Sequence, residues 1–490
     1  MNEEDIIRKF EENGLILTTH GFKRVAENKL DADEILGTAK ERKVWLITDE
    51  FISEFIGKPE EEKRKEIKTP QSLRKREILA KEVESQLEIY EDSDVTGKST
   101  CEGTLENFVD YFNQKYNSLR EILRDRPNLT GAVTIDFLKK GDTEGSMETI
   151  VMITDKTESR RGFRFLDVED PTGELRVLIP KDNRVLNNAY ERIMLDEVIG
   201  ISGRLRNDLF IAEGIFQPEL PMNHRIKIAE DPVSAVLTSD IHVGSYLFLE
   251  KEFKKFLDCL NLRGNNNEIF EKVKYVLVAG DLVDGIGVYP QQEKELSIPD
   301  IYKQYDFLAS LLAEIPDYIE VILAMGNHDA VRNAEPQPRL PKDIGGPLYD
   351  LPNVHVVGNP VTISIHGIET LMYHGTSIDS VIGSLADCTY ANPEIAMIEY
   401  LKRRYLVPTY GKKSISPERN DYLSIKEVPD ILHCGHVHAN GYADYRGVKV
   451  INSGAWQART KYQEEQGHIP TPARVPIINL QSHEVSVVHF

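Results

Sequence analysis

Cysteine, long apolar runs and a leader segment are all scarce or missing in this sequence. The chain has 490 residues but only 4 cysteines, without CxxC spacing, which excludes a disulfide scaffold and indicates a reducing compartment. The longest apolar runs, such as residues 321–325, are far too short to span a bilayer. The acidic start at residues 1–5 has no basic and then apolar leader. We therefore expect a cytoplasmic protein without a membrane partner.

Positive charge is also scarce relative to negative charge. The chain carries 59 lysines and arginines against 80 aspartates and glutamates, a net charge of −21. Attraction of the whole surface to nucleic acid is therefore not expected, and binding of a polyanion would need a local basic patch, metal ions or a partner chain. The basic cluster at residues 74–76 is one candidate patch, although charge runs of this kind usually face solvent.

Hydrophobic residues make up 40% of the chain, enough for about three folded domains. Residues 1–56 are the first region, where apolar spacing and a capping box at Asp31 and Glu34 predict a small helical module. Such a module would serve protein contact or cap the main body. Residues 57–128 are rich in charge, which predicts an exposed linker interrupted by a helix over residues 105–123.

The hydrophobic period changes to two from residue 129 to residue 220. Phe163 and Phe165 alternate with polar residues, a turn follows at residues 170–173, and alternation resumes beyond it. Short strands with turn signals at this spacing predict a small barrel, and an OB-fold barrel of about 90 residues fits. A barrel of this kind binds DNA in some proteins and docks other proteins elsewhere, so the fold alone does not decide its role.

Residues 231–490 alternate short apolar runs with helical stretches, which predicts an α/β layer structure. The helical stretches cover residues 247–260 and 301–315. The apolar runs that read as strands are residues 233–239, 275–279, 321–325, 370–373 and 431–434. A further strand pair near the C-terminus could close the sheet or extend to another chain.

Polar residues follow these apolar runs, where each predicted strand ends. The five segments are Asp240-Ile241-His242, Gly280-Asp281-Leu282-Val283-Asp284-Gly285, Gly326-Asn327-His328-Asp329, His374-Gly375 and Gly435-His436-Val437-His438. The carboxyl ends of strands are the edge of an α/β sheet where binding sites assemble. Imidazole nitrogen, carboxylate oxygen and amide oxygen together suit Mn²⁺, Fe²⁺ or Zn²⁺. Each segment alone is weak evidence, but the ordered set predicts a metal site.

A carboxylate shared between two ions would make this site dinuclear. Such ions sit roughly 3.5–4 Å apart, where they can clamp a phosphate and lower the pKa of a bound water. The sequence contains neither GxSxG nor GxxxxGK[ST], and a Ser-His-Asp triad does not explain the spacing. The pattern therefore favours metal-dependent hydrolysis of a phosphate ester.

The ordered segments resemble the full motif set of the calcineurin-like metallophosphoesterases, whose fold is a two-sheet α/β sandwich. The barrel directly before that domain resembles the B subunits of replicative DNA polymerases. The proline-rich stretch over residues 327–338 is similar to the small subunits of archaeal DNA polymerase D. The resemblance covers residue 129 to the C-terminus and, more loosely, the N-terminal region. It implies a domain order of helical module, linker, barrel and phosphoesterase.

The resemblance also implies roles for single residues. The first ion would be held by Asp240, His242, Asp281 and His438. The second would be held by Asp281, Asn327, His374 and His436, so that Asp281 bridges. His328 would protonate the leaving 3′ oxygen or stabilise its charge. Asp284 and Asp329 would either orient ligand histidines and the loop, or simply form turns. Mn²⁺ is the expected metal, with Fe²⁺ and Mg²⁺ as alternatives.

The function implied by the resemblance is a 3′–5′ exonuclease that proofreads DNA with a single-stranded or mismatched 3′ end in an archaeal cell. Its partner would be a large catalytic polymerase subunit, with the sliding clamp as a further candidate. Eukaryotic B subunits have lost many of these ligands, and this sequence keeps them, which favours an active enzyme. The alternatives are a mainly structural subunit or a free-standing repair nuclease. Tyr289, Tyr410 and Trp456 are candidates for base stacking, although aromatic residues in loops usually pack inside.

Overall fold

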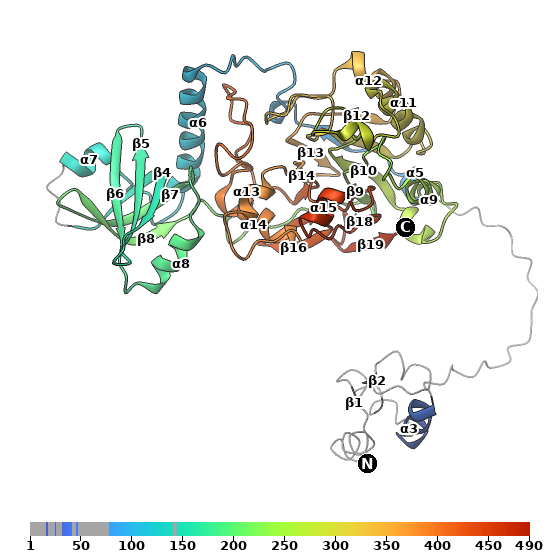
Figure 1. Cartoon of the computed structure of the whole chain (residues 1–490), viewed down its shortest axis with the longest axis horizontal. Helices are drawn as coiled ribbons and strands as arrows, with labels where there is room; N and C mark the ends of the chain where they lie inside the picture. The colour runs from blue at the N-terminus through green and yellow to red at the C-terminus, as the bar shows by residue number, and fades with distance from the viewer. Residues whose placement is uncertain (1–15, 18–24, 26–31, 42–45, 48–77, 141–144) are drawn as a thin grey trace, which may run out of the picture. The chain divides into compact units, whose positions relative to one another are not determined.

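The computed structural model describes residues 16–17, 25, 32–41, 46–47, 78–140 and 145–490 (Figure 1). The chain divides into two compact units, Met1–Lys75 and Arg76–Phe490. In the first unit, strands β1 (Ile16–Leu17) and β2 (Leu46–Ile47) pair in parallel, and helix α3 (Ala32–Glu41) buries Ile35, Leu36 and Ala39. The helix predicted after Asp31 is therefore present, whereas the strand pair was not predicted. The other helices expected before residue 57 lie outside the described residues.

The segment before residue 105 belongs to the body of the second unit. It contains α5 (Leu79–Glu82), β3 (Leu87–Ile89) and the 3-10 helix η1 (Glu91–Ser93), and β3 pairs antiparallel with β13 (Val361–Ile365). The side chain of Asp94 is buried, and its Oδ2 accepts a hydrogen bond from the Gly358 backbone N–H at 2.8 Å. The prediction of an exposed linker is wrong here, because two apolar residues in a charged segment are enough for an edge strand. Residues 57–77, with the basic cluster, lie outside the described residues.

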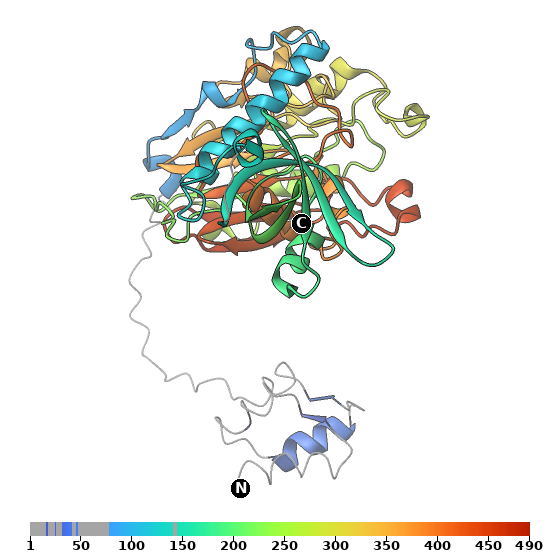
Figure 2. The same cartoon turned by 90° about the vertical axis from the view of Figure 1, so that its left-hand side faces the viewer.

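Helix α6 (Leu105–Arg124) leads into a closed barrel, which faces the viewer in Figure 2. The barrel strands, in the order β4-β5-β6-β8-β7, are β4 (Met147–Glu158), β5 (Arg164–Asp170), β6 (Gly173–Ile179), β8 (Leu209–Phe216) and β7 (Val198–Arg206). Helices α7 (Ile135–Lys140) and α8 (Arg184–Arg192) pack against it. Leu166 and Val168 point into the barrel core, so Phe163 and Phe165 face outward by the period-two rule.

Two six-stranded sheets form the rest of the unit. The first, in order, is β12 (Val354–Val356), β11 (Glu320–Ala324), β10 (Val273–Ala279), β9 (Ser234–Thr238), β18 (Arg474–Asn479) and β19 (Val485–His489). The second is β16 (Gly441–Tyr445), β17 (Val448–Asn452), β15 (Ile431–Cys434), β14 (Ile368–Met372), β13 (Val361–Ile365) and β3. Strands β9 to β12 are parallel, and the C-terminal pair β18–β19 extends this sheet by antiparallel pairing with β9.

The two sheets face each other and carry helices on their outer sides. Tyr275 and Leu277 of β10 point toward the second sheet, whereas Val276 and Val278 point toward the helices, as strand alternation requires. The helices beside the first sheet are α9 (Glu250–Leu260), α10 (Asn267–Phe270), α11 (Ile301–Leu312) and α12 (Lys342–Tyr349) (Figure 1). Helices α13 (Ile378–Ile382) and α14 (Pro393–Arg403) cover the second sheet, and the 3-10 helix η2 (Gln292–Lys294) and helix α15 (Lys461–Glu465) lie in loops.

The barrel and the second sheet share one core. Leu119 of α6 and Ile150 of β4 belong to the same buried cluster as Met397 of α14 and Leu432 of β15. The barrel is therefore fixed against the two-sheet body by apolar packing. Among the residues that the structure describes, no helix combines the length and the apolar character that crossing a bilayer requires.

Candidate metal centre

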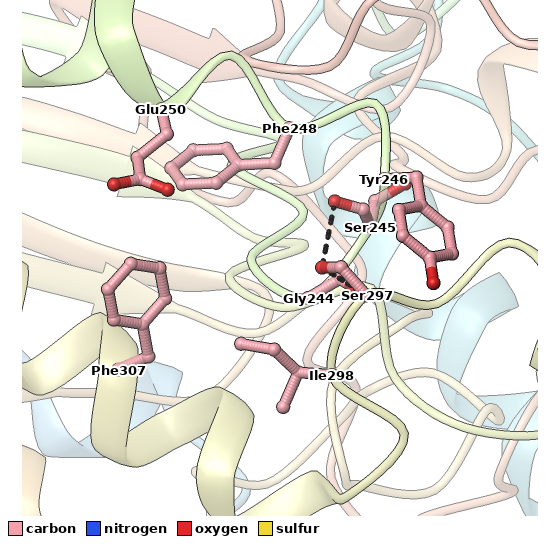
Figure 3. A pocket seen from close by; sticks show the side chains of 8 residues that line it. All are labelled: Gly244, Ser245, Tyr246, Phe248, Glu250, Ser297, Ile298 and Phe307. Carbon is pink, nitrogen blue, oxygen red and sulfur yellow. Dashed lines mark hydrogen bonds between the residues drawn. The ribbon is translucent and has the colours of Figure 1, made fainter.

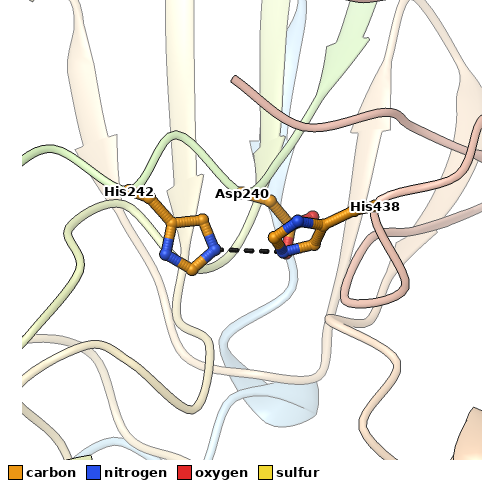
Figure 4. A group of neighbouring side chains, drawn as sticks. All are labelled: Asp240, His242 and His438. Carbon is orange, nitrogen blue, oxygen red and sulfur yellow. Dashed lines mark hydrogen bonds and ion pairs between the residues drawn. The ribbon is translucent and has the colours of Figure 1, made fainter. Parts of the chain in front are cut away.

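The strand ends bring the first group of predicted ligands together, and Figure 4 shows three of them, Asp240, His242 and His438. Asp240 and His242 follow β9, Asp281 follows β10, and His438 comes from the loop after β15. The Nε2 atoms of His242 and His438 are 3.1 Å apart, and Asp240 Oδ1 lies 3.4 Å from His438 Nε2. Asp281 Oδ2 lies 3.8 Å from His242 Nε2. The four side chains thus enclose one small volume between the edges of both sheets.

The second predicted group meets at Asn327, which follows β11. Its Oδ1 lies 3.0 Å from His374 Nε2 and 3.1 Å from His436 Nδ1. Asp281 Oδ2 is 3.3 Å from His374 Nε2. The same Asp281 oxygen therefore lies near imidazole nitrogens of both groups, which is the position that a bridging ligand needs. The assignment of ligands to two ions stays a prediction, and the geometry accommodates it.

The backbone of the centre is held in an unusual conformation. Residues other than glycine with positive φ include Asp240 (50°), His242 (53°), Asp281 (52°), His436 (71°) and His438 (56°). Such left-handed residues are costly, and they gather where function over-determines the structure. Gly326 is needed for a related reason, since a Cβ there would lie 2.2 Å from Asp281 Oδ1. The strained turns aim the side chains inward.

The donor atoms fit divalent cations. His242 Nδ1 donates to Asp284 Oδ1 at 3.0 Å, so His242 Nε2 presents its lone pair to His438 and the carboxylates. His374 Nδ1 donates to the Ala279 carbonyl at 2.7 Å, so its Nε2 faces the oxygens of Asn327 and Asp281, where a bound cation would replace the proton on Nε2. Lone pairs of nitrogen and oxygen atoms repel one another at these distances. A cation bound between them would remove this repulsion. A set of nitrogen and oxygen donors without sulfur suits Mn²⁺, Fe²⁺ and related ions.

The acids and imidazoles of the centre shift the pKa values of one another. Burial opposes the charged form of His374, but the carboxylate of Asp281 more than offsets it and raises the pKa of His374 to about 10. Burial also opposes charge on Asp281, yet the neighbouring histidines, His374 first, hold its pKa well below the usual range. The site therefore already favours an ionised Asp281, the form that binds a cation.

Asp284 and Asp329 have different contacts. Asp284 orients His242 directly, and Gln457 Nε2 donates to the same Asp284 oxygen at 3.0 Å. Asp329 touches no ligand histidine; its Oδ2 accepts from the Gly326 backbone N–H at 2.8 Å, and the Tyr305 hydroxyl lies 3.1 Å from its Oδ1. Burial, and then the charge of Asp281, raises the pKa of Asp329 to about 7. Asp284 therefore contacts a predicted ligand histidine, whereas Asp329 contacts the backbone of its own loop, and the positioning role of each stays a prediction.

His328 lies beside the predicted ligands. Its Nδ1 donates to the Asp284 carbonyl at 2.8 Å, and its backbone N–H donates to Asp281 Oδ1 at 2.8 Å. Its ring centre lies 4.7 Å from that of His242. No other hydrogen bond to the His328 ring occurs within the described part of the chain, so Nε2 is the ring nitrogen without a hydrogen-bond partner there.

Two positioning contacts were not predicted from the sequence. Asp379 Oδ2 lies 3.1 Å from His436 Nε2 and 2.7 Å from Lys413 Nζ. The amide of Gln463 lies 3.0 Å from His438 Nδ1. Asp379 lies in the short helix α13 and Gln463 in α15, so neither follows a strand, which is the signal that identified the ligands. In the sequence, the position of Asp379 shortly after His374 is the one feature that could have indicated its role.

The candidate aromatic residues differ in their surroundings. Trp456 is only 1% exposed and donates its indole N–H to Thr238, so it cannot stack on a base. Tyr410 packs against Phe108 and Phe112 of α6. Of the three, Tyr289 is the one beside the centre, with its ring centre 6.3 Å from that of His328.

A cavity of about 390 Å³ adjoins the segment that follows His242 (Figure 3). It is lined by Gly244, Ser245, Tyr246, Phe248, Glu250, Ser297, Ile298 and Phe307. The Ser297 hydroxyl donates to backbone carbonyls of this same lining, which holds the two segments together. None of the predicted ligands lines this cavity, so it is separate from the metal centre.

Comparisons with known proteins identify the family of this chain. The calcineurin-like phosphoesterase family matches residues 234–465. The chain is 36% identical over 488 residues to the DNA polymerase II small subunit of Methanothermobacter thermautotrophicus, covering 98% of each chain. It is 44% identical over 411 residues to that of Methanocaldococcus jannaschii, covering 82% of this chain and 68% of the relative. The subunit of Archaeoglobus fulgidus is 42% identical over 389 residues, with 78% and 77% covered. The resemblance predicted from the motifs is thereby confirmed.

Proposed function

Because the chain belongs to the family of archaeal DNA polymerase II small subunits and contains a calcineurin-like phosphoesterase domain, we propose that it is a 3′–5′ exonuclease that hydrolyses DNA phosphodiesters. The observation that carries this proposal is the convergence of both predicted ligand groups on Asp281 Oδ2, with His328 beside them. An inactive scaffold would have no need to keep this set of buried polar groups, which is costly without a cation.

The proposed centre would hold two divalent ions. Asp240, His242, Asp281 and His438 would hold one, and Asp281, Asn327, His374 and His436 would hold the other. Mn²⁺ is the expected metal, with Fe²⁺ and Mg²⁺ as alternatives. The ions would supply positive charge to the phosphate and lower the pKa of a water nucleophile.

Other side chains of the protein hold these ligands in place and transfer the proton. The Asp284 carbonyl fixes His328 through Nδ1, so the proton that His328 transfers is the one on Nε2. In its protonated form, His328 gives that proton to the 3′ oxygen that leaves when the phosphodiester breaks. The Asp281 carboxylate, which accepts the His328 backbone N–H, holds the acid in register with the ligands.

The barrel and the N-terminal unit are proposed to serve assembly and substrate delivery. In this proposal residues 129–220 are the OB-fold barrel, and residues 231–490 together with residues 78–104 are the phosphoesterase domain. Residues 1–56 remain the proposed contact module. The partners would be a large catalytic polymerase subunit and DNA with an unpaired 3′ end. With a net charge of −21, most of the DNA-binding groove would come from the large subunit.

The test is degradation of a primer with a mismatched 3′ end, with Mn²⁺ and with a chelator, by the chain alone and with its large subunit. We expect metal-dependent release of nucleotides from the 3′ end and loss of activity in Asp281→Asn. The matched control is Asp300→Asn, which alters the cap of α11 rather than the centre. Absence of Mn²⁺-dependent degradation by the wild type would contradict the proposal and favour a structural subunit.

A further inference from the structure

Tyr289 stands out among the exposed aromatic residues because of its neighbour. Its side chain is 36% exposed, and its ring centre lies 6.3 Å from that of His328 with the planes at 62°. Its hydroxyl donates to Glu295 Oε2 at 2.9 Å, which pins the far end of the ring. A partly exposed ring that is fixed at one edge offers a surface on which a flat apolar group can stack.

The loop that carries Tyr289 is tied to the proposed centre. Gln292 is fully buried, and its Nε2 donates to the Asp284 carbonyl at 2.7 Å and to Asp284 Oδ2 at 3.1 Å. Its Oε1 accepts the Val288 backbone N–H at 2.9 Å. Gln292 thus clamps the residue before Tyr289 to the aspartate that orients His242. The position of the ring is therefore set by the same contacts that set the centre.

The start of this loop also lies very close to the loop that carries His328. A Cβ at Gly285 would lie 2.3 Å from the His328 carbonyl oxygen, and the φ of Gly285 is +75°. Only glycine allows the two loops to approach this closely. The close approach of the two loops therefore places the ring of Tyr289 beside the imidazole of His328. In the proposed reaction this is the side of the centre where the leaving oxygen would depart.

We propose that Tyr289 is the stacking platform for the nucleobase of the nucleotide that carries the leaving 3′ oxygen. This inference rests on the proposed exonuclease function, in which His328 gives its proton to that oxygen. A nucleotide with its 3′ oxygen at His328 Nε2 has its own sugar and base next to the imidazole. Tyr289 is an exposed aromatic side chain that the structure places beside that imidazole.

The platform defines the class of substrate. A base can stack on Tyr289 only when its face is free, so the end of the strand must be single-stranded, frayed or mismatched. Stacking is tolerant of sequence because every base has a flat face. It also needs no positive charge, which suits a chain with a net charge of −21. Tyr289 thus makes the centre select unpaired ends without reading bases.

The test uses the full chain in complex with its large subunit and measures kcat/KM on single-stranded DNA with Mn²⁺. Tyr289→Leu removes the ring but keeps apolar bulk, and Tyr289→Phe keeps the ring. We expect Tyr289→Leu to lose on the order of tenfold in kcat/KM and Tyr289→Phe to stay near the wild type. The matched control is Tyr442→Ala, because Tyr442 is 44% exposed on β16 and contacts Lys449 rather than the centre.

A second substrate separates stacking from disturbance of the centre. It is the same oligonucleotide with an abasic sugar at the position next to the 3′ end, which carries the leaving oxygen but no base. We expect the wild type and Tyr289→Leu to cleave it equally. Equal activity of both on normal DNA, or an equal loss on both substrates, would overturn the stacking role. Failure of the wild type to degrade any DNA would instead contradict the proposed function itself.

Discussion

The imidazole Nε2 of His436 lies 3.1 Å from Oδ2 of Asp379, while its Nδ1 lies 3.1 Å from the amide oxygen of Asn327. The carboxylate also bonds Lys413 at 2.7 Å, and burial is outweighed by the charges of His436 and Lys413, which hold the pKa of Asp379 far below the usual range. An ionised acid behind a metal-ligating histidine fixes its ring and raises its basicity. Asp379 is therefore a positioning residue for the proposed second ion.

Replacing Asp379 by alanine should weaken metal binding. Loss of an acid behind a ligand histidine typically costs roughly 10–100-fold in metal affinity. The measurement is calorimetric titration of the metal-free protein with Mn²⁺, which needs no activity. Asp379→Asn keeps an acceptor oxygen and should lose less. Asp387→Asn is the control, since Asp387 pairs with Arg192. Unchanged Mn²⁺ affinity in Asp379→Ala would show that the contact does not position His436.

Replacing His328 by alanine should slow the reaction without releasing metal. Loss of a general acid typically lowers kcat by roughly 100-fold to 10,000-fold. The rate of primer degradation and the metal content of the purified variant measure the two effects separately. His355→Ala is a suitable control, because His355 pairs with Glu320 at 2.8 Å within the first sheet. A His328 variant that loses its metal would instead make His328 a ligand, and a fully active variant would remove it from the mechanism.

The motif residues were predictable because their signal is local. Fully buried parallel strands such as β10 appear as continuous apolar runs, and the turn after each strand shows glycine next to a polar residue. Strand order, and the division of the five strand ends between two sheets, do not follow from these runs, since pairing depends on contacts far apart in the chain. The resemblance, not the spacing, supplied the assignment of ligands to two ions.

The elements and residues that the sequence did not predict also have a physical explanation. Strand β3 has only three residues, too few to show a period of two, and its pairing partner β13 is distant in sequence. Asp379 and Gln463 reach the centre from short helices, where an acid or amide normally faces solvent. The position of Tyr289 depends on the buried Gln292, whose role exists only in the folded loop. Such residues become recognisable only when distant segments are assembled.

The contact between barrel and phosphoesterase contains a buried ion-pair cluster that should be sensitive to mutation. Arg403 and Glu399 of α14 are both 1% exposed, and Arg403 also lies 3.4 Å from Glu197 of the barrel side. Breaking a buried pair by removing one partner typically costs about 3–5 kcal/mol. We expect Arg403→Met to lower the denaturant midpoint clearly. The exposed pair Lys140–Asp136 provides the control, where Lys140→Met should change little.

The same cluster predicts acid sensitivity. Burial opposes charge on Glu399, but Arg403 and Lys402 more than compensate and lower its pKa from 4.5 to about 2. Since the pKa is lower in the folded chain, this contribution is full above pH 4.5 and is lost as the pH falls toward 2. Denaturant unfolding between pH 5 and pH 3 should show a steeper loss in the wild type than in Glu399→Gln. Equal slopes would mean that the cluster does not hold the ionised acid.

Lys115 should produce a second rise of stability with pH, this time at high pH. It lies in α6, fully buried, where Nζ donates to the Pro408 carbonyl at 2.8 Å and sits 4.5 Å from the centre of the Tyr405 ring. Burial without a paired carboxylate lowers its pKa from 10.5 to about 8, although Asp196 partly opposes the shift. The free energy of unfolding is therefore reduced at any pH at which Lys115 is charged, because folding buries that charge.

The sign of this effect follows from proton counts. Between pH 8 and pH 10.5 the unfolded chain holds a proton on Lys115 that the folded chain has released, so the free energy of unfolding rises with pH across this window. The gain amounts to about 3 kcal/mol at its upper end. Because other groups titrate there too, the measurement is the difference in slope between the wild type and Lys115→Met, with exposed Lys139→Met as the control. Parallel curves for the wild type and Lys115→Met would mean that Lys115 stays charged in the folded protein.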